Sequence, residues 1–274
     1  SDWFAFQLTM SVDHQHNLID TGKIIRNTHR ELICSECGFK TVDNLYKILD
    51  SAIVGVNYPL TDVISIPSSI NLYFENTASF NTIRITEIAQ SAFKNQDQIK
   101  ELVLPSTITI INSSAFDGCT NLEYINLPKS LEKIGKFAFL HCEKLKEINI
   151  PSKVKIIEES SFSSCFNLTQ VTFNNDSQLQ SIENGAFSLC INLSEIIIPS
   201  SVQKIGSEAF SACNKIASFT IPNSVETIGS AAFKGWGYKQ IIYVEDRLGP
   251  PDEGWALWDK ECNAKVFWLH SSYT

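Results

Sequence analysis

Cysteine is the residue whose number and spacing most invite a chemical interpretation of this sequence. Cys34 and Cys37 form a C-x-x-C motif, a spacing found in zinc knuckles, redox dithiols and local disulfides. A closed zinc site needs four ligands, and the other candidates are scattered along the chain. They are His14, His16, His29 and Cys262. Zinc binding, redox chemistry and a local structural role or disulfide therefore stay open, with the last of these favoured.

Five further cysteines each follow a phenylalanine by three residues, once per unit of a repeat. They are Cys119, Cys142, Cys165, Cys190 and Cys213. One cysteine in each successive unit favours a small buried side chain over a metal ligand. An odd number of thiols cannot pair completely either. We expect these five thiols to be reduced and buried in the core.

Other catalytic signatures are missing from the sequence. It contains no G-x-G-x-x-G, G-x-x-x-x-G-K-[ST], H-E-x-x-H or G-x-S-x-G motif. No serine or cysteine can be assigned as a nucleophile to any of the five histidines. We therefore expect no catalytic residue, no metal and no cofactor, and the prediction is that the protein is not an enzyme.

The elements that carry these cysteines repeat with an almost constant period. Phenylalanine recurs at intervals of 23, 23, 23, 25, 23 and 23 residues, and alanine precedes it in six of seven cases, with Ser161 as the exception. The positions are Phe93, Phe116, Phe139, Phe162, Phe187, Phe210 and Phe233. A fixed period of this length is the signature of a solenoid, in which each unit cannot bury its apolar side alone.

Each unit also has a regular internal pattern. Apolar residues stand 6, 9 and 11 positions after the phenylalanine, as at Leu122, Ile125 and Leu127, and proline follows at +12 in five units. The spacing of two predicts a strand that ends at the proline. Apolar residues at +15 and +18 and a frequent glycine at +19, such as Gly135, indicate a return segment in which the glycine has positive φ or a close backbone approach. We predict a right-handed, β-rich leucine-rich-repeat array of about seven 23-residue units, with a parallel sheet on one face.

The chain ends lack the clean repeat and are interpreted as caps. We predict an N-terminal cap with a degenerate first repeat over residues 1–70, a solenoid over 71–245 and a tryptophan-rich C-terminal cap over 246–274. Within the first cap, the spacing of Val42, Leu45 and Leu49 predicts a short helix. The C-terminal tryptophans are expected to cover the open end of the core, and a tryptophan-rich ligand site is the alternative. They are Trp236, Trp255, Trp258 and Trp268.

Composition restricts the class of partner. The 274 residues include 43% hydrophobic residues, enough for a continuous core, and carry a formal net charge of −8. This acidic balance argues against binding to a phosphate backbone, so no nucleic-acid partner is expected. No apolar run is long enough for a membrane span. Because the sequence begins with Ser1, removal of a signal peptide or an anchor stays possible.

The recurring phrase closely resembles the BspA-like, or Treponema-type, leucine-rich repeat. One instance runs from Ile134 through Phe139 and Cys142 to Pro151, and the resemblance covers about residues 80 to 245. It implies a surface-exposed or secreted module that binds host or cell-surface protein and carries no catalytic motif. An intracellular leucine-rich-repeat scaffold with a cytoplasmic location is the alternative.

The strand side chains that alternate with the buried columns are the candidate binding residues. At +8 and +10 they point outward and form a mixed polar face with apolar anchors, which suits a protein ligand. The predicted residues are Glu101, Tyr124, Asn126, Glu147, Asn149, Gln170, Thr172, Glu195, Ile197, Thr220 and Tyr243.

Overall fold

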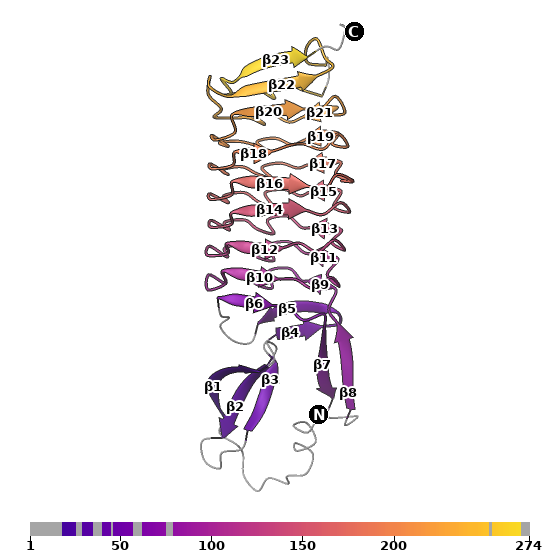
Figure 1. Ribbon diagram of the computed structural model, residues 1–274, viewed down its shortest axis with the longest axis vertical. Helices are drawn as coiled ribbons and strands as arrows, with labels where there is room; N and C mark the ends of the chain where they lie inside the picture. The colour runs from indigo at the N-terminus through magenta and orange to yellow at the C-terminus, as the bar shows by residue number, and fades with distance from the viewer. Residues whose placement is uncertain are drawn as a thin grey trace.

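The computed structural model describes residues 18–25, 29–34, 40–44, 46–56, 62–74, 79–251 and 254–269. Within these ranges the chain forms strands and turns and contains no helix. Figure 1 shows the strands stacked into one elongated solenoid, with β1 to β3 near one end and β23 (Lys265–Leu269) at the other. The predicted β-rich repeat solenoid is confirmed.

The strands predicted at +8 to +11 form the first side of the solenoid. Adjacent strands pair in parallel and in register, for example Glu101 with Tyr124 and Leu102 with Ile125. The pairing divides into three three-stranded sheets, β6-β10-β12, β14-β16-β18 and β20-β22-β23. Besides β23, the strands are β6 (Val63–Ser65), β10 (Glu101–Val103), β12 (Tyr124–Asn126), β14 (Glu147–Ile150), β16 (Gln170–Phe173), β18 (Glu195–Ile196), β20 (Ser218–Ile221) and β22 (Ile241–Glu245).

The return segments carry a second and longer sheet that the sequence pattern does not predict. Nine strands pair in the order β21-β19-β17-β15-β13-β11-β9-β5-β4, and all pairs except β4 with β5 are parallel. Gly135 and Gly206 follow two of these strands, and a Cβ there would lie 2.6 and 2.4 Å from backbone nitrogens of the preceding turn. The predicted close approach is confirmed, and the alternative of positive φ is wrong for both glycines. The strands are β4 (Tyr46–Leu49), β5 (Ala52–Val56), β9 (Glu87–Ile88), β11 (Ile110–Ile111), β13 (Lys133–Ile134), β15 (Ile156–Ile157), β17 (Ser181–Ile182), β19 (Lys204–Ile205) and β21 (Thr227–Ile228).

The phenylalanine column forms the centre of the core. All seven rings are fully buried, and consecutive rings stack with centroids 5.2 to 5.9 Å apart. The leucine, isoleucine and valine columns of both sheets pack around this stack in one continuous cluster. Because each ring contacts the rings of the adjacent turns, one unit depends on its neighbours for burial.

The corner around each phenylalanine has a repeated backbone conformation. The residues two before and two after the phenylalanine have positive φ in every unit, yet three of these fourteen are glycine and the others include Phe137 and Leu189. The amide of the phenylalanine itself donates to the next turn, as from Phe116 N to Ala138 O at 2.8 Å. The ladder of hydrogen bonds along the corner stabilises a geometry that non-glycine residues otherwise disfavour.

The predicted short helix around Val42, Leu45 and Leu49 is wrong. Val42 lies in β3 (Lys40–Asn44) and Leu49 ends β4, while Leu45 lies outside the described residues. β3 pairs antiparallel with β2 (His29–Cys34), which pairs with β1 (Leu18–Ile25), and β4 pairs with β5. Three apolar residues at helical spacing are a weak signal, and pairing with neighbouring strands overrides it. A hairpin of β7 (Ser69–Phe74) and β8 (Ser79–Arg84) then leads into the regular turns.

The tryptophans extend the core at its C-terminal end. Trp236, Trp255 and Trp258 are buried, and Trp258 lies edge-on to Phe233 at 5.8 Å. β23 adds a parallel strand beyond β22, and Trp268 on it packs partly buried against the cluster. This burial supports the packing role over a tryptophan-rich ligand site.

Candidate binding face

The outward side of β10, β12, β14, β16 and β18 places the predicted binding residues in two exposed columns. The alternation of strand side chains buries Leu102, Ile125 and Ile148 and turns their neighbours to solvent. We call this surface the strand face. All eleven predicted residues are exposed or partly exposed, and the Ile197 side chain is 85% exposed.

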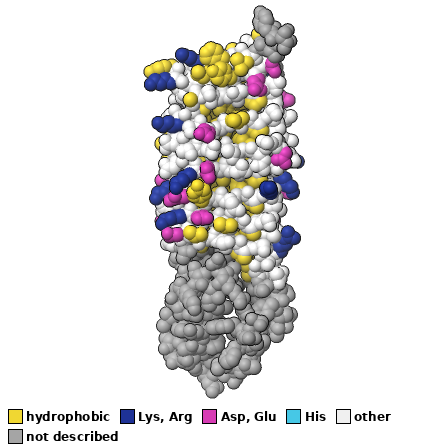
Figure 2. Space-filling view, in the orientation of Figure 1, with side chains coloured by type: hydrophobic (Ala, Val, Ile, Leu, Met, Phe, Trp, Pro, Cys, Tyr) yellow, Lys and Arg dark blue, Asp and Glu magenta, His cyan; other side chains and the backbone are white. Residues whose placement is uncertain are grey.

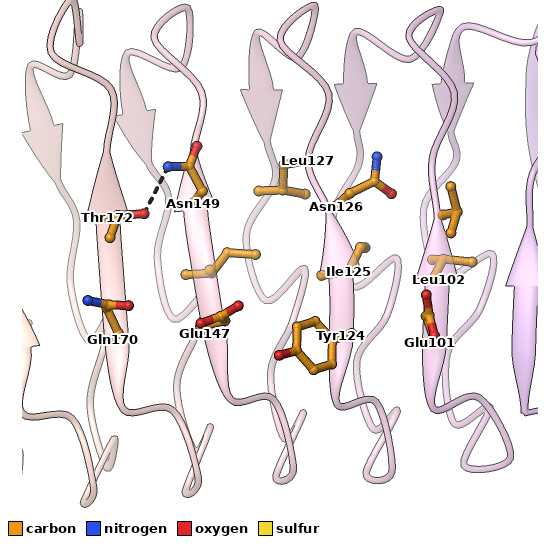
Figure 3. Close-up of a pocket in the computed structure, with 12 residues that line it drawn as sticks. Glu101, Leu102, Tyr124, Ile125, Asn126, Leu127, Glu147, Asn149, Gln170 and Thr172 are labelled. Carbon is orange, nitrogen blue, oxygen red and sulfur yellow. Dashed lines mark hydrogen bonds between the residues drawn. The ribbon is translucent and has the colours of Figure 1, made fainter.

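A hollow of about 420 Å³ crosses four neighbouring strands of this face. Figure 3 shows Glu101, Tyr124, Glu147 and Gln170 in one row along it, with Asn126, Asn149 and Thr172 in the other. Its floor includes the core side chains Ile125 and Ile148, together with Leu127. The structure thus brings seven of the predicted residues together around one concave surface.

A second hollow of about 370 Å³ continues the face over β16 and β18 and the turns after them. It shares Gln170 and Thr172 with the first and adds Glu195 and Ile197. Thr220 and Tyr243 line neither of these two hollows. The Tyr243 ring stacks instead on Phe267 of the C-terminal strand, with centroids 5.8 Å apart. Figure 2 shows hydrophobic and charged side chains mixed along the visible side of the solenoid.

The first hollow spans a break in the sheet. β12 ends one three-stranded sheet and β14 begins the next, so the paired ladder stops between them. Beside this break Ile125 is 7% exposed, compared with 1% for Leu102 on the paired side, and Leu127 is half-buried. Apolar side chains are therefore part of the surface of the hollow.

Several predicted residues have side chains that hold the turns together. Asn126 Oδ1 accepts from the amide of Leu104 at 2.7 Å, and its Nδ2 donates to the carbonyl of the same residue at 3.0 Å. Asn149 Nδ2 donates to Thr172 Oγ1 at 2.8 Å. The sequence predicted these residues as equivalent members of a face, but their hydrogen bonds indicate that they also position it.

The lysines beside the face form ion pairs with other carboxylates. Lys146 Nζ lies 2.6 Å from Glu123 Oε2 and 5.8 Å from the centre of the Tyr124 ring. The hydrogen bond and charge of Glu123 raise the pKa of Lys146, and those of Lys146 lower the pKa of Glu123. Lys100 pairs in the same way with Asp62 at 2.8 Å.

The five ladder cysteines have a structural role, and their predicted burial without disulfides is confirmed. Each Sγ donates to the carbonyl of the phenylalanine of the preceding unit at 3.1 to 3.3 Å, as from Cys165 to Phe139. Burial raises the pKa of the Cys119 and Cys190 thiols to about 12, which disfavours the reactive thiolate. In the last unit Trp236 Nε1 donates to Phe210 O at 2.8 Å in the same position.

The other candidate metal ligands are not brought together in the part of the chain that the structure describes. No group of three or more histidine, cysteine, aspartate or glutamate side chains there could hold a metal ion. Cys34 ends β2, His29 begins it and Cys262 is half-buried with a free thiol. Cys37, His14 and His16 lie outside the described residues, so the role of the C-x-x-C motif stays a prediction.

No helix among the described residues has the length and apolar character to cross a bilayer. This finding is consistent with the strand-and-turn architecture.

Comparison with known proteins gives one family. A family model described as "BspA type Leucine rich repeat region (6 copies)" matches residues 86–214 and 176–247. No curated protein matches the chain.

Two solved structures are similar in fold. The T. pallidum leucine-rich repeat protein is 23% identical with a TM-score of 0.60, covering 91% of this chain and 100% of that one. A leucine-rich repeat protein from Eubacterium ventriosum is 24% identical with a TM-score of 0.58, and the match covers 77% of this chain and 50% of that one.

Proposed function

This chain belongs to the BspA-type leucine-rich repeat family, and we propose that it is a non-enzymatic module that binds a protein ligand through its strand face. The observation that carries the proposal is the hollow of about 420 Å³, which lies on the face that the repeat leaves free to vary. Its rim is polar and its floor is partly apolar, a combination typical of protein-binding surfaces.

The rigidity of the solenoid supports recognition by this face. Tyr124 and Glu147 project from strands whose neighbouring side chains are buried in the core, so their backbone is already ordered before binding. A preordered surface loses little conformational entropy when it binds, which raises affinity for a given set of contacts. Exposed Tyr124 and Ile197 supply the apolar anchors of the kind that dominate interface energies.

The remaining parts of the chain are assigned to stability. We propose that residues 1–70 and 246–274 act as caps of the solenoid over 71–245. The antiparallel β1-β2-β3 sheet at one end and the buried Trp255 and Trp258 at the other support this division. Capping elements shield the ends of a core that otherwise runs open to solvent.

A surface-exposed or secreted location completes the proposal, and binding of a host or cell-surface protein is the corresponding role. The proposed location rests on the family, because the resemblance to BspA-type repeats implies a surface-exposed or secreted protein. Biotinylation of intact native cells with an impermeant reagent tests it, because the protein is then labelled without lysis. Labelling only after lysis would instead favour the intracellular scaffold.

The binding role is tested by substitution on two faces. A partner recovered by crosslinking from native cells is measured against Tyr124→Ala, Glu147→Ala and Ile197→Ala combined, and against Lys133→Ala with Lys155→Ala on the return segments. We expect at least about tenfold weaker binding for the first set, because about 1.4 kcal/mol of lost contact suffices. The melting temperature should stay nearly unchanged. Equal losses from both sets, or a loss from the return set alone, would place the site elsewhere.

A further inference from the structure

The strand face carries its acidic groups at a regular spacing along the solenoid axis. Glu101, Glu147 and Glu195 occupy the same strand position on every second turn and are all exposed. Neutral Tyr124 and Gln170 occupy the turns between them, and the registered pairs Glu101 with Tyr124 and Gln170 with Glu195 fix the order. Figure 3 shows the first four of these side chains in a row.

The cations nearest to this row are engaged elsewhere. Lys100 and Lys146 stand one residue before Glu101 and Glu147, but their ammonium groups pair with Asp62 and Glu123. Glu195 Oε2 accepts a hydrogen bond from Gln170 Nε2 at 2.6 Å, which orients the carboxylate and leaves its other oxygen as an acceptor. The row therefore presents three negative charges on a chain whose net charge is −8.

The spacing of the row selects the kind of cation it can bind. Parallel strands lie about 4.8 Å apart, so carboxylates on every second turn stand about 10 Å apart. Calcium–oxygen bonds are only about 2.3 to 2.6 Å long, so one ion cannot bridge neighbouring members of the row. The row instead fits one ligand that carries separate cationic groups at intervals of about 10 Å.

A polypeptide in extended conformation provides that interval. In the extended polyproline II conformation it rises about 3.1 Å per residue with three residues per turn, so every third side chain recurs on the same side at about 9 Å. The two exposed columns of the strand face come from residues two apart on a strand, about 6.7 Å, which is narrower than an α-helix of about 10 to 12 Å with its side chains. An extended chain fits between the columns, over the apolar floor formed by Ile125 and Leu127.

We infer that the strand face binds an extended, cationic protein segment that runs along the solenoid axis, with lysine or arginine at every third residue opposite Glu101, Glu147 and Glu195. This inference rests on the proposed function and names the chemistry of its ligand. Tyr124, between two of the acids, is 48% exposed and can pack against the aliphatic part of a lysine or arginine side chain. Charge complementarity of this kind sets register and increases the association rate.

Two labelled peptides of identical composition test the inference with the full chain. One ten-residue peptide has lysine at positions one, four, seven and ten, and the other has its four lysines in succession, with glycine and serine elsewhere. Binding is measured by fluorescence anisotropy at ionic strengths of about 0.01 M and 0.15 M, where the Debye length is about 30 and 8 Å. We expect the spaced peptide to bind about tenfold tighter than the clustered one, and both to weaken with salt.

A matched pair of triple variants assigns the effect to the row. Glu101→Gln, Glu147→Gln and Glu195→Gln together should weaken the spaced peptide about tenfold and remove its advantage over the clustered peptide. Glu158→Gln, Glu208→Gln and Glu226→Gln remove the same charge away from the strand face and should change binding by less than about twofold. Circular dichroism checks that both variants keep the fold.

Three results would overturn the inference: equal binding of the two peptides, equal weakening by the two triple variants, or no binding of either peptide at the lower salt. Its failure is distinct from failure of the proposed function. If the peptides show no preference while Tyr124→Ala with Ile197→Ala still weakens the native partner, the face binds protein of another chemistry. If that pair leaves the native partner unaffected, the proposed function itself fails.

Discussion

Ser161 provides a sharp test of how the core is packed, because it is the one member of the alanine column that carries a hydroxyl. The residue is fully buried, and its Oγ has no hydrogen-bond partner among the described groups. Its backbone is satisfied, since Ser161 N donates to Glu158 O and Ser161 O accepts from Phe139 N. Ser161→Ala therefore removes only the unpartnered hydroxyl and restores the residue found at Ala138 and Ala186.

The expected gain follows from the cost of an unpartnered buried hydroxyl, about 1 to 3 kcal/mol in protein mutational data. The space left by one oxygen atom lowers the gain only slightly. We expect Ser161→Ala to raise the free energy of unfolding by about 1 to 2 kcal/mol, which corresponds to a melting temperature about 2 to 4 °C higher for a chain of this length.

Urea unfolding followed by circular dichroism measures this change, provided that the m-value is unchanged between variants. The matched control is Ala138→Ser, which places a hydroxyl in the same column one turn earlier and should destabilise by a similar amount. A neutral or destabilising effect of Ser161→Ala, or a harmless Ala138→Ser, would refute the argument, because the hydroxyl would then have a partner.

The remaining predictions concern other columns of the repeat. Phe162→Ala should cost about 3 to 5 kcal/mol and Cys165→Ala about 1 to 2, since the first opens the ring stack and the second leaves a small cavity and removes one of the two hydrogen bonds to the Phe139 carbonyl; urea midpoints in the reverse order would contradict this. The ladder thiols should resist iodoacetamide at pH 8 until the protein unfolds, and mass spectrometry that finds them labelled or disulfide-linked in the native protein would argue against burial. The pKa of the Cys119 and Cys190 thiols is about 12 in the folded protein and about 8.5 in the unfolded chain, so their contribution to stability is fully present below pH 8.5 and is lost as the pH rises toward 12. If the free energy of unfolding fell with pH equally in the wild type and in Cys190→Ala across that range, the linkage would be disproved. Leu189→Gly should raise the free energy of unfolding by a few tenths of a kcal/mol. Leu189 is partly exposed, its φ of 63° costs a non-glycine residue about 1 to 2 kcal/mol, and glycine loses about 0.5 to 1 kcal/mol to chain entropy. A clear drop in urea midpoint would show that the leucine contributes contacts that outweigh the strain.

The parts of the fold that were predictable from sequence are those that repeat in residue type. The phenylalanine interval predicted the turn, and the columns around Leu122 and Ile125 predicted which side of each strand is buried. The return sheet was not predicted, because strands of two residues such as β11 and β13 are too short to show a period. Its continuity depends on backbone pairing between turns, which residue types do not record.

The corner conformation was also missed, for a physical reason that particular residues illustrate. Glycine is the usual signal of positive φ, but Ser114, Phe137 and His141 have positive φ here because hydrogen bonds from their backbone amides to carbonyls of the next turn hold the backbone. The donor role of the ladder thiols was equally invisible, since a buried cysteine reads as a small apolar residue until its distance to a carbonyl is known. The helix predicted near Val42 failed because pairing with neighbouring strands decided the conformation.

The periodicity of the sequence predicted which residues lie on the strand face. It did not predict which of them also hydrogen-bond to adjacent turns. Alternation along the strands places Tyr124 and Asn126 on the same exposed surface. Whether an exposed side chain also bonds to an adjacent turn depends on the register and spacing of the turns, as for Asn126, which bonds to the backbone of Leu104 in the preceding turn.

Site-specific photo-crosslinking tests directly whether the partner binds through the strand face, because it reports where a bound partner lies without removing any contact on which the fold depends. A photoreactive residue is placed at the exposed Ile197 of the strand face, and in a second variant at Lys155 on the return segments. With the partner recovered from native cells, binding through the strand face should give adducts from Ile197 and few or none from Lys155. Adducts from Lys155 alone, or equal yields from both positions, would contradict binding through the strand face.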